Sequence, residues 1–186
     1  MEVCREWAIE VDEDRQRPNL QAQEEFIVSF VGSLYDGIDS GHQVLSKVSS
    51  LHYTRIYNPE RDKKGAYVRL RVFADQQDLQ SIENEIDIRL EPLKEERLAF
   101  QVDKRTIEWN DIGEEYGGAS LSRLFRDYLH STSKISYELL RKKPEGIDVD
   151  RVLWRWTHFF FNATRGYSRS IIEVAQGAVT GFISNV

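Results

Sequence analysis

The stretch Leu51–Phe73, LHYTRIYNPERDKKGAYVRLRVF, predicts two strands joined by a polar loop. In its second strand apolar and polar residues alternate strictly. Val68 and Leu70 therefore point to one face of a sheet, and Arg69 and Arg71 point to the other. The aliphatic face is an obvious core face. The opposite face, where arginines stand between aromatic residues, is not one that a purely structural strand needs.

The arginines of this stretch suggest an anion-binding surface. On the first strand Tyr53, Arg55 and Tyr57 share one face. Antiparallel pairing of the two strands could bring Arg55 beside Arg69 and Arg71. A guanidinium group offers a planar fork of donors that matches a carboxylate or a phosphate, so three of them form an anion pocket. The alternative is an exposed sheet face on which the arginines pair with the chain's many acidic residues.

Composition narrows the class of protein. The chain has 186 residues, 40% hydrophobic and 30% charged, with a net charge of −6. These values are typical of a soluble globular domain and argue against general nucleic-acid binding, which needs a basic surface. The only cysteine is Cys4, which excludes an internal disulfide and a cysteine-based zinc site. The four histidines show no metal-ligand spacing: His42, His52, His130 and His158. We expect no metal and no cofactor.

The location follows from what the sequence does not contain. The amino terminus, MEVCREWAIEVDEDRQ, is charged almost at once and does not resemble a signal peptide. No apolar run approaches the roughly 20 residues that span a bilayer. We therefore expect a cytoplasmic protein that does not contact a membrane.

The order of elements predicts an α+β fold. A strand is expected over Glu6–Val11, and a helix from about Leu20 to Tyr35 with its apolar stripe at helical spacing. After the hairpin, a helix opens at Asp75 and is stopped or kinked by Pro92, and a last strand covers Leu98–Trp109. The order β-α-β-β-α-β is that of a ferredoxin-like antiparallel sheet with helices on one face.

A helical segment follows, and we take residues 1–186 as a single domain: a sandwich portion over 1–112 and a helical portion over 113–186 packed on it. One helix is expected from Ala119, with a break near Ser131. The stretch Val152–Ala163 is apolar nearly all round, so its helix should be buried. Its polar residues step by four, three, four and three along one side: Arg151, Arg155, His158, Asn162 and Arg165. His158 is either an acid–base group or a core histidine bonded to a backbone carbonyl.

Three motifs in this order resemble a known family. The first is Arg55 and Pro59 followed by Arg69 and Arg71, with Tyr67 where the family has histidine. The second is Glu114-Glu115-Tyr116-Gly117-Gly118 before a helix with Phe125 and Asp127. The third is His158 with Asn162. Together they resemble the carboxy-terminal, elimination-type domain of lantibiotic dehydratases, the thiopeptide-type bacteriocin biosynthesis domain.

The resemblance implies a chemistry. The family's domain removes the α-proton of a glutamylated serine or threonine in a ribosomally made peptide and expels glutamate, and a related group closes a pyridine ring by formal cycloaddition. It implies catalytic roles for His158, Arg69, Arg71 and Glu115. It also implies that a peptide substrate is bound by these side chains: Arg55, Tyr67, Tyr116, Asn162 and Arg165.

The chain departs from the family's pattern at several positions. Glu115 stands where the family has arginine, and Ala163 follows Asn162 where the family has arginine. The large glutamylating domain that normally precedes this one is absent, so we expect a separate glutamylating or dehydratase partner, and a homodimer is a further expectation. Two alternatives remain: a non-catalytic peptide- or anion-binding subunit, and a structural ferredoxin-like protein.

Overall fold

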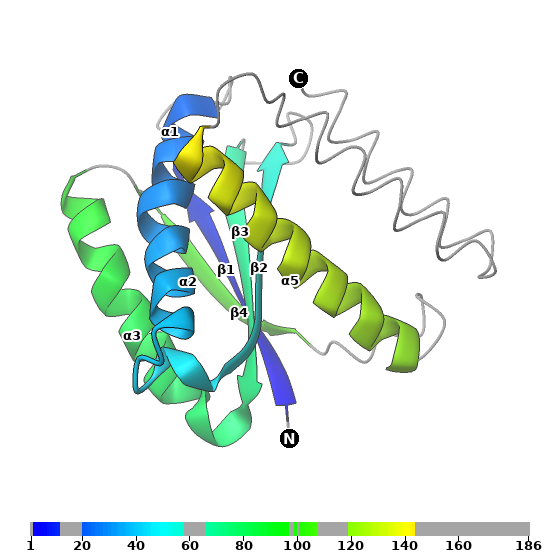
Figure 1. The fold of residues 1–186 in the computed structure, drawn as a ribbon. Coiled ribbons are helices and arrows are strands. Elements are labelled where there is room, and N and C mark those ends of the chain that lie inside the picture. The colour runs from blue at the N-terminus through cyan, green and yellow to red at the C-terminus, as the bar shows by residue number, and fades with distance from the viewer. Residues whose placement is uncertain are drawn as a thin grey trace, which may run out of the picture.

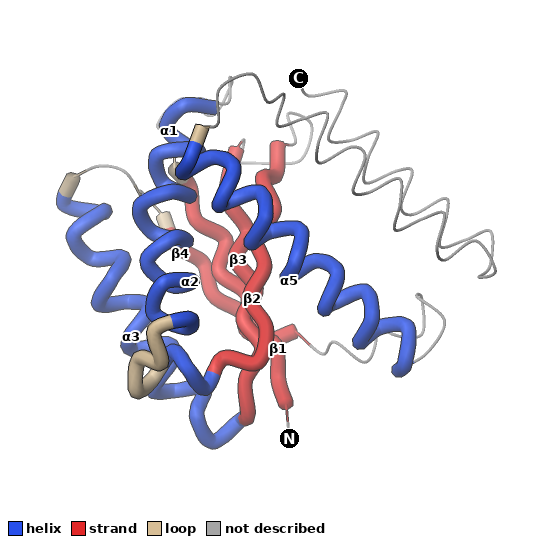
Figure 2. Tube along the Cα trace, in the orientation of Figure 1, coloured by secondary structure: helices blue, strands red, loops and turns tan. Residues whose placement is uncertain are grey.

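The computed structural model describes residues 2–11, 20–57, 66–96, 99, 101–107 and 119–143. It shows an α+β fold in which a four-stranded antiparallel sheet carries helices (Figures 1 and 2). The strands are β1 (Glu2–Glu10), β2 (Val48–Tyr57), β3 (Ala66–Asp75) and β4 (Val102–Ile107). The helices are α1 (Leu20–Phe26), η1 (Ile27–Val31), α2 (Gly32–Asp39), η2 (Leu45–Lys47), α3 (Gln76–Glu95) and α5 (Ala119–Lys142).

The strand order across the sheet is β2-β3-β1-β4, and all three pairings are antiparallel. The two central strands, β1 and β3, are far apart in sequence and pair along the whole of β1, from Glu2 opposite Asp75 to Glu10 opposite Tyr67. Helices α1, α2 and α3 lie on one face of the sheet (Figure 1). The antiparallel sheet and the separation of Val68 and Leu70 from Arg69 and Arg71 confirm the predictions made from the alternating strand.

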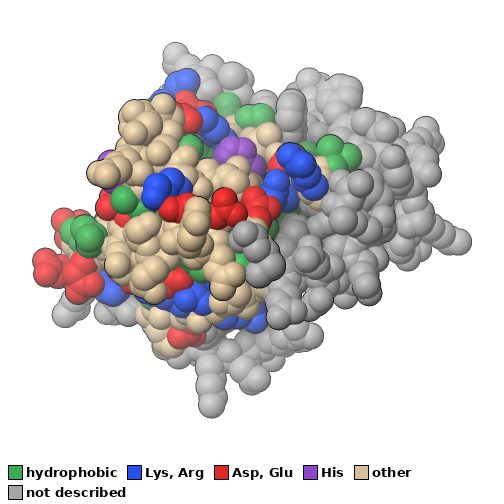
Figure 3. All heavy atoms as spheres, turned by 90° about the horizontal axis from the view of Figure 1, so that it is seen from below, with side chains coloured by type: hydrophobic (Ala, Val, Ile, Leu, Met, Phe, Trp, Pro, Cys, Tyr) green, Lys and Arg blue, Asp and Glu red, His purple; other side chains and the backbone are tan. Residues whose placement is uncertain are grey.

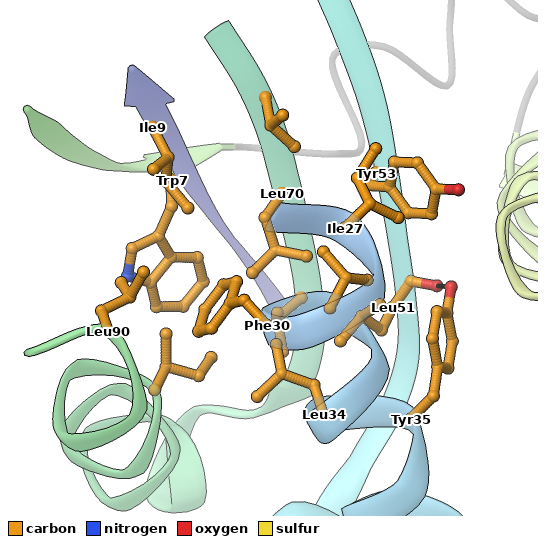
Figure 4. Packing of buried hydrophobic residues seen from close by; sticks show 14 of the residues in the cluster. Trp7, Ile9, Ile27, Phe30, Leu34, Tyr35, Leu51, Tyr53, Leu70 and Leu90 are labelled. Carbon is orange, nitrogen blue, oxygen red and sulfur yellow. Dashed lines mark hydrogen bonds between the residues drawn. The ribbon is translucent and has the colours of Figure 1, made fainter. Parts of the chain in front are cut away.

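The core lies between the sheet and the helices, as Figure 4 shows. In the register of β1 and β3, Trp7 is opposite Leu70 and Ile9 is opposite Val68. All four side chains are fully buried. The helices add apolar side chains at the predicted spacing, which are Phe26, Ile27, Phe30, Val31, Leu34, Ile82, Ile86 and Leu90. Burying aliphatic and aromatic area of this kind is the main stabilising term of the fold.

The first helical segment follows the predicted stripe but is not uniform. A single turn of π-helix, η1, joins α1 to α2, and the helical segment runs on to Asp39 rather than ending near Tyr35. The Ser29 hydroxyl donates to the backbone carbonyls of Glu25 and Phe26 in the turn before the π segment. A π turn shifts the helical face, which leaves residues on both sides of it pointing at the sheet.

The predicted stop at Pro92 and the predicted break near Ser131 do not occur. Helix α3 continues through Pro92 to Glu95, because a proline near the carboxyl end costs one backbone hydrogen bond while the last turn is still closed by the Glu96 N–H bonding the Pro92 carbonyl. Helix α5 runs through Ser131, whose hydroxyl bonds the Asp127 carbonyl one turn back. Such back-bonding satisfies a serine inside a helix without breaking it.

Helix α5 covers the outer edge of β2. His130 Nδ1 lies 3.1 Å from the Leu51 nitrogen and 2.8 Å from its carbonyl oxygen. The Ser133 hydroxyl lies 3.2 Å from both the nitrogen and the carbonyl oxygen of Tyr53. Leu51 and Tyr53 direct these groups away from β3, so the side chains of α5 take the place of a further strand.

The docking of α5 depends on a close approach at Gly32. A Cβ atom on Gly32 would lie 2.6 Å from the ring of Tyr137, so any larger residue there would push the ring away. Tyr137 is buried and stacks on Tyr35 with ring centroids 5.6 Å apart. The Tyr35 hydroxyl in turn donates to the Leu51 carbonyl at 3.1 Å, the dashed line in Figure 4. One chain of contacts thus joins α2, α5 and β2.

Among the described residues no helix is long and apolar enough to cross a membrane. The loop over 58–65, the stretch over 108–118 and the expected helices beyond Pro144 lie outside the described residues. So do the motif residues Tyr116–Gly118 and the expected buried helix with its polar stripe.

Candidate functional site

The predicted arginine face is built around a glutamate. Glu6 of β1 stands between Arg71 of β3 and Arg105 of β4 in the register of the sheet. Its Oε2 accepts a hydrogen bond from Arg71 Nε at 2.8 Å, and its Oε1 accepts from Arg105 Nε at 2.7 Å. Arg69 Nε lies 3.5 Å from Oε2. Three guanidinium groups therefore surround one carboxylate on the sheet face opposite the core.

The electrostatics of this cluster favour an ionised Glu6. The side chain is buried, and burial alone would raise the pKa of its carboxyl group. The hydrogen bond and positive charge of Arg71, the charge of Arg69 and the hydrogen bond from Arg105 outweigh burial, so the pKa lies below its ordinary value. Since one carboxylate faces three cations, the cluster keeps an excess of positive charge.

The exposure of the three arginines differs. The side chains of Arg71 and Arg69 are 16% and 25% exposed, whereas that of Arg105 is 65% exposed. Neither Arg69 nor Arg71 stands in bulk solvent, the arrangement that would have contradicted a pocket. Tyr67 also lies on this face, where its hydroxyl accepts a hydrogen bond from Arg69 Nη2 at 3.1 Å.

Arg55 does not join this cluster, and that prediction is wrong. The hairpin pairs Tyr57 with Ala66 and Arg55 with Val68, so odd-numbered residues of β2 share a face with even-numbered residues of β3. Arg55 consequently points to the helix side, where its Nη1 lies 3.8 Å from Oε1 of Glu24 on α1. The loop between Tyr57 and Ala66 has an even number of residues, and this is why odd-numbered residues of β2 pair with even-numbered residues of β3.

One of the β2 residues that do face the arginines is His52, which is opposite Arg71. Its ring is buried and packs against Phe73 with centroids 5.8 Å apart. Burial, together with the positive charges of Arg71 and the neighbouring groups, lowers its pKa from 6.5 to about 3. His52 is therefore neutral at physiological pH.

The signals for Glu6 and His52 were partly visible in the sequence. The alternation that places Trp7 and Ile9 in the core also places Glu6 on the opposite face. What the sequence does not show is that β1 lies between β3 and β4, since this depends on tertiary contacts. For His52 the signal is weaker, because its face depends on the register of the hairpin.

Helix α5 reaches the border of this face. Arg126 lies over the ring of Phe73, 5.3 Å from its centroid, and forms an ion pair with Glu2 at the start of β1. Phe73 is next to Cys4 in the register. Burial raises the pKa of the Cys4 thiol to about 12, so it is not a nucleophile at neutral pH.

The charged side chains at the amino-terminal end of the molecule are mixed in sign. Figure 3 views the described residues from below, where lysine and arginine alternate with aspartate and glutamate around a histidine. No single-sign patch appears on the described part of this surface.

Five predicted site residues lie outside the described residues: Glu115, Tyr116, His158, Asn162 and Arg165. Of the predicted site, the structure therefore brings together Tyr67, Arg69 and Arg71, and it places Arg55 on the other face of the sheet. In the described ranges no group of three histidine, cysteine, aspartate or glutamate side chains could hold a metal ion.

Neither a scan against protein-family models nor a search of curated proteins finds a match for this chain. The resemblance to lantibiotic dehydratases accordingly rests on the motifs in the sequence alone.

Proposed function

We propose that the protein is an elimination-type enzyme similar to the carboxy-terminal domain of lantibiotic dehydratases. It would bind a ribosomally made peptide carrying a glutamylated serine or threonine, remove the α-proton, and expel glutamate to leave dehydroalanine or dehydrobutyrine. The observation that carries the proposal is the placing of Arg69 and Arg71 on one sheet face, with Arg105, against a single carboxylate.

The roles follow from charge. Elimination develops negative charge on an enolate and on a departing carboxylate, and guanidinium groups aimed at these positions stabilise the transition state. Arg69 and Arg71 would supply that stabilisation, with Tyr67 beside them. His158 would move the proton, and Glu115 would act beside it, while Tyr116, Asn162 and Arg165 would hold the peptide. His52 is neutral and lies next to Arg71, and we propose that it packs beside that arginine without taking part in the reaction.

A ferredoxin-like assignment of the fold belongs to this proposal. The order of elements and the strand order β2-β3-β1-β4 support it. We further propose a cytoplasmic location and a separate glutamylating partner, because the elimination consumes a peptide that has first been glutamylated.

The test is a direct assay of elimination. The purified protein is incubated with a synthetic peptide bearing a glutamyl ester on serine, and mass spectrometry follows the loss of glutamate. Arg71→Ala and His158→Ala should each abolish the loss, since one removes a transition-state cation and the other the proton carrier. Arg89→Ala is the matched control, because Arg89 pairs with Glu85 on α3 in the helix layer.

If the peptide stays intact after long incubation with the wild-type protein, the proposed enzymatic activity is wrong. If elimination continues in both Arg71→Ala and His158→Ala, the roles assigned to these two residues are wrong.

A second candidate is a non-catalytic module that binds an anionic peptide. The observation that favours it is Glu6, which accepts hydrogen bonds from Arg71 and Arg105. Part of the positive charge of these arginines is therefore already neutralised within the protein. Binding of the glutamylated peptide, measured by fluorescence anisotropy, without any loss of glutamate would identify this function. Arg71→Ala should then weaken binding, whereas Arg89→Ala should leave it unchanged.

A further inference from the structure

The two edge strands of the sheet, β2 and β4, differ in whether other parts of the chain bond their outer backbone groups. Helix α5 covers the edge at β2, whereas in the described part of the chain no strand or helix side chain pairs with the outer edge of β4. The side chains from Asp103 to Thr106 are all exposed. An uncovered edge strand presents a row of backbone donors and acceptors to which another strand can add.

The direction of those backbone groups follows from the pairing of β4 with β1. The Glu10 N–H donates to the Gln101 carbonyl at 2.9 Å, and in the same register Ala8 is opposite Asp103 and Glu6 is opposite Arg105. In an antiparallel ladder, hydrogen-bonded pairs recur at every second residue. Asp103 and Arg105 therefore direct their backbone groups toward β1.

The intervening residues of β4 direct theirs outward. Val102, Lys104 and Thr106 consequently present the N–H and C=O groups of the outer edge, because successive residues of a strand alternate between its two sides. A partner strand must align its own outward residues with these three. This requirement leaves only a few registers in which β4 could pair with a copy of itself.

We propose that β4 pairs antiparallel with β4 of a second copy of this chain, about a two-fold axis at Lys104. This register places Lys104 opposite the partner's Lys104 and Val102 opposite the partner's Thr106. All three outward residues of each strand then form hydrogen-bonded pairs. The two sheets join into one continuous sheet of eight strands.

Charge selects this register over its neighbours. With the axis at Lys104, Asp103 is opposite the partner's Arg105, and this pair occurs twice. Moving the axis to Asp103 would put two aspartates opposite one another, and moving it to Arg105 would do the same with two arginines. Opposite charges across a strand pair stabilise it and like charges destabilise it, most strongly in the closer, non-hydrogen-bonded pairs.

The facing lysines do not oppose the pairing strongly. On the helix side of β4, Lys104 forms an ion pair with Asp87 of α3 in its own chain. Each Lys104 ammonium group is therefore drawn toward a carboxylate and away from its symmetry mate. The acid on α3 is what allows the axis to fall at a lysine.

The dimer keeps both Glu6 clusters on one side of the joined sheet, because antiparallel pairing about such an axis preserves the faces. Asp103 then approaches the most exposed arginine of the neighbouring cluster, Arg105, and the partner's Asp103 contributes to each site. A stable interface needs roughly 1,000 Å² or more of buried surface, and a strand of this length supplies little of it. We therefore expect a weak dimer that dissociates on dilution.

Analytical ultracentrifugation over a range of concentrations tests the proposal. The wild-type chain should show a monomer–dimer equilibrium. Asp103→Arg alone and Arg105→Asp alone should each be monomeric, because each creates like-charge pairs in the proposed register. An equimolar mixture of the two variants should recover the dimer, since each pairing of position 103 with the partner's position 105 is then opposite in charge.

Two further variants keep the test decisive. Lys104→Pro removes an outward N–H, which an edge strand tolerates when the N–H faces solvent, and it should also be monomeric. Asp36→Arg makes the same charge change as Asp103→Arg on α2, and it should dimerise like the wild type. Circular dichroism confirms that each variant is folded. A monomeric wild-type chain at the highest concentration, or a dimer that persists in folded Lys104→Pro, would overturn the proposal. A mixture that fails to recover the dimer would overturn the register.

Discussion

The two faces of β3 are stabilised by different physics. On one face Val68, Leu70 and Val72 are fully buried against β1 and the helices, and their contribution scales with the apolar area removed from water. On the other face Arg69 and Arg71 are partly exposed and depend on one buried carboxylate, Glu6. The first arrangement tolerates similar apolar residues, whereas the second depends on charged groups that one register of the sheet brings together.

The comparison predicts that the apolar face carries the largest single stability effects. Trp7→Ala should lower the free energy of unfolding by about 3–5 kcal/mol, because it leaves a large cavity opposite Leu70. Urea denaturation followed by circular dichroism measures the loss. Trp7→Phe, which keeps much of the buried area, should lose clearly less. Equal losses in both variants would contradict an effect that scales with area.

The charged face should lose about 2 kcal/mol when Glu6 is changed to Gln, since hydrogen bonds to charged groups contribute in this range. The pKa of Glu6 is lowered in the folded protein, so its contribution is present above the ordinary value of 4.5 and is lost as the pH falls through the lower folded value. Denaturation at neutral and acid pH should thus show the two proteins converge in acid. Glu91→Gln, on the exposed side of α3, is the control and should change little.

His52 should give the charged face a second pH dependence, in a higher range. Its pKa is about 3 when folded and 6.5 ordinarily, so the unfolded chain takes up the proton first as the pH falls. Stability is then unaffected above pH 6.5 and decreases below it, by about 1 kcal/mol over the first pH unit. His52→Asn should remove this slope, and an unchanged slope in the variant would place its origin elsewhere.

The smallest effect should come from the most exposed member of the cluster. Arg105→Ala should cost under about 1 kcal/mol, because an ion pair at a largely exposed guanidinium is screened by water. Arg71→Ala should cost more, since its side chain is only 16% exposed. Double-mutant cycles with Glu6→Gln give the two coupling energies. A larger coupling for Arg105 would reverse the assignment of Arg71 as the main partner.

Sequence reasoning predicted the apolar face well because alternation and helical spacing are local properties. The core positions of β1 and β3 that face the helices follow from the alternation, and the apolar stripes of the first helical segment and of α3 follow from the helical spacing. The charged face was predicted only for Arg69 and Arg71, which lie on the same strand. Arg55 was misplaced because the parity of the hairpin depends on how many residues its loop contains, and Glu6 was missed because no local pattern reveals which strands are neighbours.

Helix α5 also sets an order of events during synthesis. The backbone groups of Leu51 and Tyr53 are satisfied by His130 and Ser133, which leave the ribosome some eighty residues later. Until then the nascent chain carries a finished hairpin with a bare outer edge. We therefore expect chaperones to bind that edge during synthesis. We also expect chains truncated before Ala119 to aggregate, because they lack the helix that covers β2.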